Sequence, residues 1–286
     1  MNNFSILNDN NRLNILTDNL DNPKIILIHL HGLHGHFQHI YDCADDFTNR
    51  TEILKKANIK SYALEFRGHG KSSGKVGYFK NFDELMSDFE RLLEYIKHLH
   101  PNIPTYLLGE SMGGGMSVKI AILFEQISGI ILLAPMLGVA NKIKPKDYLI
   151  NFLLKIATRF PNVKLINKTK YKKYKYKDYN IKYIESEYTI KNKLTLGILK
   201  ECHLLCKWID DNKMNFNKSL LIIHSKLDDI TCVEKSKNFY EKCSSPDKEI
   251  LLVDNSEHCL LVPNSKIDCM PQTLMLKIVN WLNKKL

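Results

Sequence analysis

Serine residues in two separate segments of this chain stand in a pattern that suits nucleophilic catalysis. The segments 70–74 (GKSSG) and 109–113 (GESMG) both fit Gly-x-Ser-x-Gly. A serine hydroxyl attacks a carbonyl at neutral pH only when a histidine takes its proton and a carboxylate orients that histidine. The pattern therefore predicts acyl-transfer chemistry, but on its own it does not decide which serine carries it out.

The surroundings of the two serines favour Ser111 as the nucleophile. Ser111 follows directly after the strand-like residues 105–108 (TYLL), and Gly113 opens an apolar-periodic helix. Such a sharp turn from strand to helix exposes the serine, and the helix N-terminus favours negative charge that develops beside it. Ser72 instead lies several residues beyond its strand, and the next helical segment starts only near Phe82. We therefore interpret Ser72 as a loop residue.

An acid and a general base should follow the nucleophile in the chain order serine, acid, histidine. Only His258 among the histidines follows the predicted strand 219–224, so it is the candidate base. The loop after that strand offers the neighbours Asp228 and Asp229 as the acid. We interpret Asp254, although it is close to His258 in the sequence, as the end of the last strand. Chain order alone leaves both Asp228 and Asp229 open.

Two backbone amides should stabilise the oxyanion of the tetrahedral intermediate. One comes from the residue after the nucleophile and the other from the loop after the first core strand, which here are Met112 and Leu33. Gly32 allows the chain to turn tightly enough to aim the amide of Leu33. We also expect His31, Gly32 and Glu110 to contribute to substrate binding.

Two histidine-containing groups raise the question of a metal site. Five histidines lie between His29 and His39, and Cys202, His203 and Cys206 share a predicted helix. A catalytic zinc needs three ligands on rigid elements and an open position. The histidines span a strand end and a glycine-rich turn with no nearby carboxylate or thiolate, and the two thiols have no further ligand. We therefore expect neither a metal nor any other cofactor.

Short β-rich runs alternate with helical patterns through most of the chain. The runs are continuously apolar, which indicates strands covered on both faces and hence a mostly parallel sheet. The predicted strands are 24–30, 61–66, 105–108, 129–134, 219–224 and 248–254, and the predicted helices are about 44–57, 82–98, 113–126, 233–243 and 272–284. The alternation predicts a doubly wound α/β fold.

The alternation is interrupted once, by a helical stretch without a clear buried strand. We therefore expect an α/β core formed by residues 1–136 and 216–286, and an inserted helical cap formed by residues 137–215. Within the cap, residues 148–160 (YLINFLLKIATRF) predict an amphipathic helix. Such a helix either packs on its own protein or touches a membrane surface, and the sequence leaves both readings open.

The net charge of +10 is the property of this chain that is most typical of nucleic-acid-binding proteins. Residues 137–215 contain 18 Lys and Arg against 7 Asp and Glu, so the cap carries the whole excess. Its segment 171–179 (YKKYKYKDY) interleaves aromatic and basic residues, but no nucleic-acid module surrounds it. We interpret it as a solvated surface, with attraction to anionic lipid as the functional alternative, and expect no nucleic-acid partner.

The cysteines and the apolar runs indicate the cellular compartment of the protein. The seven cysteines form an odd number without CxxC pairs, and residues 1–20 lack the apolar stretch of a secretory signal. The longest apolar run, 130–140, is too short to cross a bilayer. We therefore expect reduced thiols in a cytoplasmic protein whose only membrane contact, through the basic cap, would be peripheral.

Five motifs carry a resemblance to a known family. They read HGLHGH at 31–36, EFRGHGKSSG at 65–74, GESMGGG at 109–115, HSKLDD at 224–229 and EHCLL at 257–261. Together they resemble the monoglyceride lipase and lysophospholipase branch of the α/β-hydrolases. The resemblance implies that the acid is the fifth residue of an HGxxD motif, which is Asp228, although His224-Ser225 replaces the usual His-Gly. It also implies a helical cap over a tunnel for one acyl chain.

The motifs and the resemblance lead to one expected activity. We expect a serine ester hydrolase that cleaves monoacylglycerol or lysophospholipid through an acyl-enzyme on Ser111, with His258 and Asp228 completing the triad. A general carboxylesterase or thioesterase is the nearest alternative. A peptidase with the same triad is a further alternative, although the HGGPG-like loop expected of a proline iminopeptidase is missing. A binding protein without turnover has no need of nucleophile, base, acid and oxyanion loops together.

Overall fold

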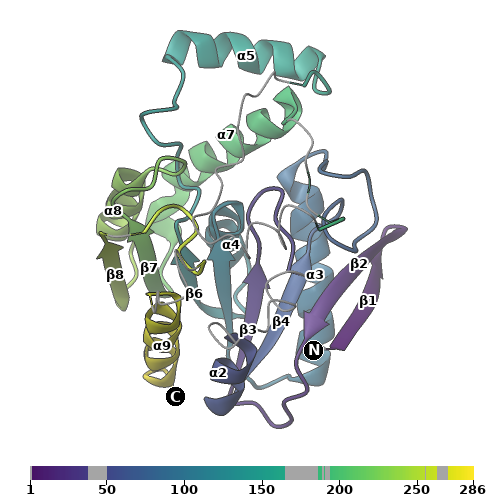
Figure 1. The fold of residues 1–286 in the computed structure, drawn as a ribbon, viewed down its shortest axis with the longest axis vertical. Helices are drawn as coiled ribbons and strands as arrows, with labels where there is room; N and C mark the ends of the chain where they lie inside the picture. Colours follow the sequence, from purple (N-terminus) through teal and green to yellow (C-terminus); the bar gives the residue numbers. More distant parts are fainter. Residues whose placement is uncertain are drawn as a thin grey trace.

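The computed structural model describes residues 2–37, 50–164, 186–188, 190, 194–254, 256–262 and 270–286. Its strands are β1 (Asn2–Asn8), β2 (Asn11–Thr17), β3 (Ile25–Leu30), β4 (Ile59–Glu65), β5 (Thr105–Glu110), β6 (Ile127–Leu133), β7 (Ser219–Ser225) and β8 (Lys248–Val253). Its helices are α2 (Arg50–Lys56), α3 (Phe82–Leu99), α4 (Met112–Leu123), α5 (Asp147–Arg159), α7 (Leu196–Asn212), α8 (Val233–Lys242) and α9 (Met270–Asn283), with a 3₁₀ turn η1 (Lys213–Asn215). Figure 1 shows these elements around one sheet.

The strands form one sheet in the order β1-β2-β4-β3-β5-β6-β7-β8. The pairs β1–β2 and β2–β4 are antiparallel, and every pair from β4 to β8 is parallel. The predicted doubly wound, mostly parallel sheet is therefore confirmed. The chain leaves the centre in opposite directions from β3 and β5, and such a switch point is where α/β sheets form their sites.

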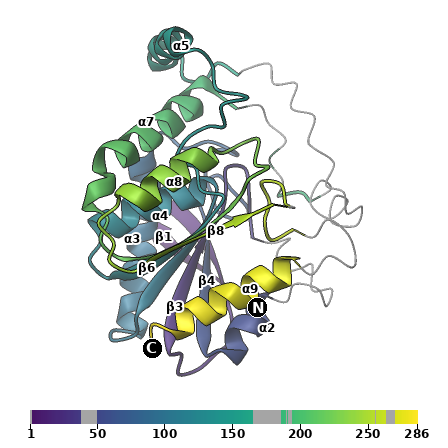
Figure 2. The ribbon, with the colours of Figure 1, turned by 90° about the vertical axis from the view of Figure 1, so that its left-hand side faces the viewer.

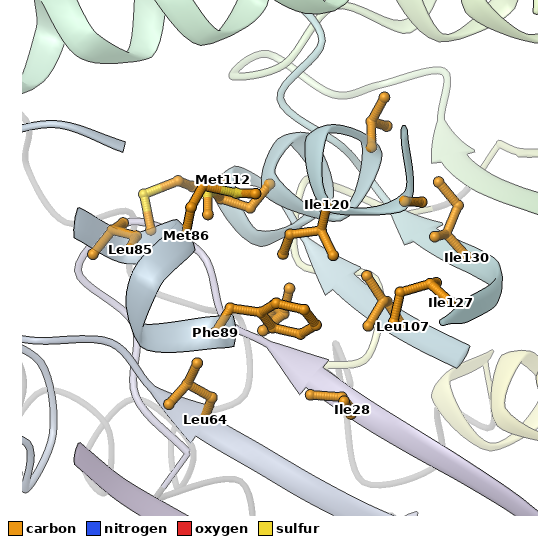
Figure 3. Packing of buried hydrophobic residues seen from close by; sticks show 14 of the residues in the cluster. Ile28, Leu64, Leu85, Met86, Phe89, Leu107, Met112, Ile120, Ile127 and Ile130 are labelled. Carbon is orange, nitrogen blue, oxygen red and sulfur yellow. The ribbon is translucent and has the colours of Figure 1, made fainter. Parts of the chain in front are cut away.

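Helices cover both faces of the sheet, as the continuously apolar strands predict. The helices α3, α4 and α8 contribute to one hydrophobic cluster, and α2 and α9 contribute to another on the opposite face (Figure 2). Figure 3 shows Leu85 and Phe89 of α3 in one group with Met112 and Ile120 of α4 and Leu107 of β5. The side chain of Met112 thereby anchors the first residue of α4 in the core.

An antiparallel hairpin extends the parallel sheet at one edge, and the sequence analysis did not predict it. Its strands β1 and β2 pair from Asn2 opposite Thr17 to Asn8 opposite Asn11. The turn residues Asp9 and Asn10 have φ angles of 45° and 65°, the left-handed conformation that a two-residue hairpin turn requires. The edge strand β1 is at most half-buried, whereas β2 contains four consecutive buried residues.

Between β6 and β7 the chain leaves the sheet and runs through α5 and α7 (Figure 1). Helix α7 packs closely on α4, since a Cβ atom at Gly115 would lie 3.2 Å from Leu205 Cδ2. Helix α5 packs on α7, farther from the sheet, as Figure 1 shows. Its Ala157 is buried, while Tyr148 and Phe152 are 72% and 59% exposed. One apolar side of α5 is therefore covered and another is open.

Several predicted features fall outside the described residues. These are the basic segment 171–179, His39, Cys43, Cys269 and the part of the predicted helix 44–57 that precedes Arg50. Within the described ranges, no helix has the combination of length and apolarity needed to span a bilayer. Cys202, Cys206, Cys232 and Cys243 are free thiols.

Candidate active site

Ser111 occupies the turn that connects β5 to α4. Its φ and ψ angles are 54° and −113°, a conformation that typically costs about 1–3 kcal/mol and persists where the surrounding structure enforces it. The Ser111 amide donates to the Leu133 carbonyl at 3.0 Å, and the Ser111 carbonyl accepts from the Met136 amide at 2.8 Å. A Cβ atom at Gly113 would lie 2.1 Å from the Leu30 carbonyl oxygen. The sharp turn therefore requires glycine at position 113.

The second Gly-x-Ser-x-Gly serine has a different setting. Ser72 is only 9% exposed, and its hydroxyl donates to the Glu65 carbonyl at 2.5 Å and accepts from the Asn14 amide at 2.8 Å. These bonds tie the loop after β4 to β2. The geometry agrees with the interpretation of Ser72 as a loop residue.

Asp228 and His258 meet through a direct hydrogen bond. His258 Nδ1 lies 2.8 Å from Asp228 Oδ2, and the Asp228 side chain is fully buried. Asp228 Oδ1 accepts from the amides of Ile230 and Thr231 at 2.8 and 2.9 Å. Burial alone would raise the pKa of the Asp228 carboxyl, but the hydrogen bonds from His224, His258 and the Ile230 amide outweigh it and hold that pKa well below its ordinary value. Asp228 is therefore an anion beside His258.

Thr231 joins the acid loop to the end of β6. Its hydroxyl oxygen lies 2.8 Å from Asp228 Oδ2 and 3.1 Å from the Ala134 carbonyl oxygen. Ala134 follows directly after Leu133, the residue whose carbonyl accepts from the Ser111 amide. The acid loop and the serine turn are thus fixed to consecutive residues at the same end of the sheet.

The neighbouring carboxylates are placed differently from Asp228. Asp254 is 67% exposed and forms an ion pair with Lys226 at 2.8 Å, which fits its interpretation as a strand end. The carboxylate that accepts the hydrogen bond from His258 Nδ1 is that of Asp228.

A second histidine, His224, contacts the same carboxylate oxygen of Asp228 as His258 does, although in the sequence it was only part of a motif. His224 is fully buried, and its Nε2 lies 3.2 Å from Asp228 Oδ2. Its Nδ1 lies 2.9 Å from the Ser236 hydroxyl. Because the carboxylate can only accept, His224 donates through Nε2, and Nδ1 accepts from Ser236. The signal in the sequence for this contact was the position of His224, which ends the predicted strand 219–224 directly before the loop of Asp228.

The loop after β3 lies directly against Ser111. A Cβ atom at Gly32 would lie 3.2 Å from Ser111 Cβ and 3.8 Å from Ser111 Oγ. The Gly32 carbonyl accepts from the Gly35 amide at 2.9 Å, so Leu33 lies inside a tight turn. Met112 is the first residue of α4, and the first amides of a helix have no partner within it. These are the two amides that the sequence analysis assigned to the oxyanion.

His31 uses both ring nitrogens to shape this loop. Its Nε2 accepts from the Phe66 amide at 3.1 Å, so the proton resides on Nδ1, which donates to the Gly32 carbonyl at 2.8 Å. Burial, followed by the nearby ring of His69, holds the pKa of His31 well below its ordinary value. His31 is therefore neutral and holds one tautomer.

The other histidines of this region are also neutral. Burial lowers the pKa of His29 to about 3 and the pKa values of His34, His36 and His69 to about 4. In the described part of the chain, no group of three or more His, Cys, Asp or Glu side chains has an arrangement that could hold a metal ion.

Glu110 directly precedes Ser111 in the chain, and Arg50 contacts the Glu110 carboxylate. Arg50 Nη1 lies 3.1 Å from Glu110 Oε1, and Arg50 is only 6% exposed. Glu110 remains 28% exposed. Arg50 Nη2 also donates to the Leu261 carbonyl at 3.0 Å. Sequence reasoning missed Arg50, because nothing in the pattern of α2 distinguishes it from an ordinary surface arginine.

Comparisons with known proteins place this arrangement in a family. The family model described as "Serine aminopeptidase, S33" matches residues 21–264. A monoacylglycerol lipase from Mycolicibacterium smegmatis is 28% identical over 124 residues, which cover 43% of this chain and 42% of that protein. A caffeoylshikimate esterase from Arabidopsis thaliana is 24% identical over 78% of this chain and 69% of its own length. The alignment with the first relative thus spans less than half of that protein.

A solved structure agrees with the fold. A soluble variant of the monoglyceride lipase from Saccharomyces cerevisiae, in complex with a substrate analogue, superposes with a TM-score of 0.80 at 19% identity and covers 99% of this chain and 94% of its own. The sheet order and the serine turn at the end of β5 define an α/β-hydrolase. The chain belongs to the serine aminopeptidase, S33, family of α/β-hydrolases, and it resembles the monoglyceride lipases among them.

Proposed function

We propose that the protein is a serine ester hydrolase in which Ser111, His258 and Asp228 form the catalytic triad. The observation that carries this proposal is the 2.8 Å bond between His258 and the buried Asp228 at the end of the sheet where Ser111 occupies its strained turn. Asp228 fixes the proton on His258 Nδ1, which leaves Nε2 as the base.

The chemistry follows from these roles. Ser111 Oγ attacks the ester carbonyl carbon while His258 Nε2 takes the hydroxyl proton. The resulting oxyanion is stabilised by the amides of Leu33 and Met112, and one such donor typically contributes about 3–4 kcal/mol. The intermediate collapses, the leaving alcohol receives the proton from His258, and the acyl group stays on Ser111. Water activated by His258 then releases the acid and regenerates the serine.

The substrate we propose is a monoacyl lipid, either monoacylglycerol or lysophospholipid. The similarity to monoacylglycerol lipases supports this class, and the esterase among the relatives keeps a general carboxylesterase or thioesterase as the alternative. His31, Gly32 and Glu110 border the proposed substrate site. Gly32 approaches the nucleophile directly, while His31 acts through the shape of the loop.

We further propose that residues 137–215 form a cap over this site. Helix α7 packs on α4, which begins directly after Ser111, and Ile190 returns to the core with only 3% exposure. A Cβ atom at Gly77 would lie 2.8 Å from Ile190 Cγ2. The Lys71 ammonium lies 5.5 Å from the centre of the Tyr188 ring. The cap residues 188 and 190 thus rest on the loop after β4, close to the proposed oxyanion loop.

The open side of α5 supports a peripheral contact with a lipid surface. Tyr148, Leu149 and Phe152 are all exposed, and the cap carries the positive charge of the chain. Apolar side chains that enter the headgroup region beside basic residues would bring the site to its substrate in a cytoplasmic protein.

One comparison tests the proposed function. Wild type and Ser111→Ala are assayed on a long-chain monoacylglycerol, a lysophosphatidylcholine and a short p-nitrophenyl ester. Turnover of either lipid that disappears in Ser111→Ala supports the monoacyl lipid class and identifies the head group. Ser111-dependent turnover of the short ester alone would indicate a general carboxylesterase. No Ser111-dependent turnover and no labelling by a fluorophosphonate would contradict the proposed activity.

A further inference from the structure

The segment that carries His258 has no regular secondary structure, so contacts from elsewhere must fix its position. It follows β8 and comprises residues 256–262, here called the base segment. Leu260 and Leu261 are each only 3% exposed and hold it on the core. Apolar contacts are non-directional and do not set the angle at which the imidazole approaches Ser111. Two buried polar side chains supply directional bonds at the two ends of the segment.

Ser225 holds the end of the base segment that precedes His258. It is the last residue of β7, is fully buried, and its hydroxyl donates to the Ser256 carbonyl. The same oxygen accepts from the Leu227 amide at 3.0 Å, and the Ser225 carbonyl accepts from the Asp228 amide at 3.3 Å. One residue thus connects the loop of the acid with the segment of the base. A glycine or alanine at this position would lack the bond to Ser256.

Arg50 holds the end that follows His258. One guanidinium nitrogen binds Glu110, the residue before the nucleophile, and another binds the carbonyl of Leu261. The planar guanidinium presents its donors in a rigid fork, so the two contacts fix the distance between the nucleophile turn and the base segment. A lysine has a single nitrogen on a flexible stem and does not impose this geometry.

We propose that Ser225 and Arg50 are positioning residues that hold the base segment from both ends, so that His258 stays aligned with Asp228 on one side and Ser111 on the other. The inference rests on the proposed triad. Neither residue touches the reacting atoms. Their effect is on alignment, and a displacement of about 1 Å in a site of this kind costs about 100-fold in rate.

The test measures how fast Ser111 is acylated. The second-order rate of labelling by a fluorophosphonate, and kcat and KM on a soluble ester, are compared for wild type, Ser225→Ala and Arg50→Met. Two matched controls remove similar bonds elsewhere. Ser219→Ala deletes a hydroxyl at the opposite end of β7, where it binds Asp247, and Lys60→Met deletes a buried cation that binds the carbonyls of Asp18 and Leu20.

We expect Ser225→Ala and Arg50→Met to label at least about tenfold more slowly and to lose kcat in proportion, while KM changes less than about twofold. The controls should keep the wild-type labelling rate, whatever thermal stability they lose. Glu110→Gln keeps the shape of its side chain and weakens the Arg50 contact, so it should label at an intermediate rate. It provides the test should Arg50→Met fail to fold.

The outcomes separate the inference from the function on which it rests. A wild-type protein that does not react with the probe overturns both. A reactive wild type whose folded Ser225→Ala and Arg50→Met variants label at the wild-type rate leaves the triad standing and overturns the positioning roles. Equal slowing in Ser219→Ala and Lys60→Met would assign the effect to general destabilisation and would also overturn them.

Discussion

His224 Nε2 lies 3.2 Å from the same carboxylate oxygen of Asp228 that His258 contacts at 2.8 Å. Together with the Thr231 hydroxyl and the amides of Ile230 and Thr231, the two imidazoles surround the carboxylate with donors. A carboxylate with this many partners has little freedom to rotate. The proposed catalytic acid is therefore oriented before a substrate arrives.

The first prediction concerns the choice of acid. Asp228→Asn should lower kcat by about 10⁴-fold, because an amide no longer selects the required tautomer of His258. Asp229→Asn should retain most of the activity, since the bond to His258 comes from Asp228. Steady-state kinetics on a soluble ester with both variants would show which of the two aspartates is the catalytic acid. Inactivity of Asp229→Asn beside an active Asp228→Asn would reverse the assignment.

The second prediction concerns His224. His224→Phe removes one donor from the buried carboxylate, and a hydrogen bond to a charged group is worth about 1.5–3 kcal/mol. We expect kcat/KM to fall at least about tenfold. Ser236→Ala, which removes only the partner on the far ring nitrogen, should have a smaller effect. Wild-type activity in a folded His224→Phe protein would show that the second imidazole does not support the acid.

The third prediction concerns pH and stability. Burial lowers the pKa of His69 to about 4, below the value of about 6.5 in an unfolded chain. Between these two values the unfolded state binds the proton more readily, so His69 should cost the fold about 1.4 kcal/mol per pH unit as the pH falls from about 6.5 toward 4. Its full contribution is present above pH 6.5.

Urea unfolding at a series of pH values measures this slope. His69→Gln lacks the titrating ring and should show a flatter dependence than wild type between pH 6.5 and 4. His98→Gln replaces a histidine on the outside of α3 and serves as the control. Identical slopes in wild type and His69→Gln would contradict the prediction.

The fourth prediction concerns the open side of α5. Replacing Leu149 and Phe152, which are 39% and 59% exposed, with serine should weaken binding to vesicles of anionic lipid. Hydrolysis of a short soluble ester should be unchanged, because these side chains lie away from the site. Leu99→Ser removes a similarly exposed leucine, 48% exposed, from the core helix α3 and should bind vesicles normally. Equal losses in both assays would indicate a folding defect instead.

The sequence predicted the parallel part of the sheet because its strands are continuous apolar runs, a pattern that few other arrangements produce. The hairpin β1–β2 was missed because polar residues interrupt the apolar residues of both strands, so that neither forms such a run. Its signal was local, namely the Asp9-Asn10 turn between two alternating segments.

In the candidate site, the residues whose chemistry restricts the residue type could be predicted from the sequence. The residues that hold them in position could not. Ser111 and His258 follow from the turn geometry and chain order that acyl transfer requires. Arg50 and Ser225 reach the base segment through bonds to backbone carbonyls, and any residue can offer a carbonyl. Such partners leave no pattern in a sequence, so only the structure brings them together.

The contact between Arg50 and Leu261 joins residues 211 positions apart in the chain. Closing so long a loop carries an entropic cost, which is smallest once the intervening chain is already ordered. During refolding, the sheet and its helices would therefore be in place before the base segment is locked to the serine turn. Recovery of labelling at Ser111 would then report the last step of folding, and it would lag behind the recovery of helical signal.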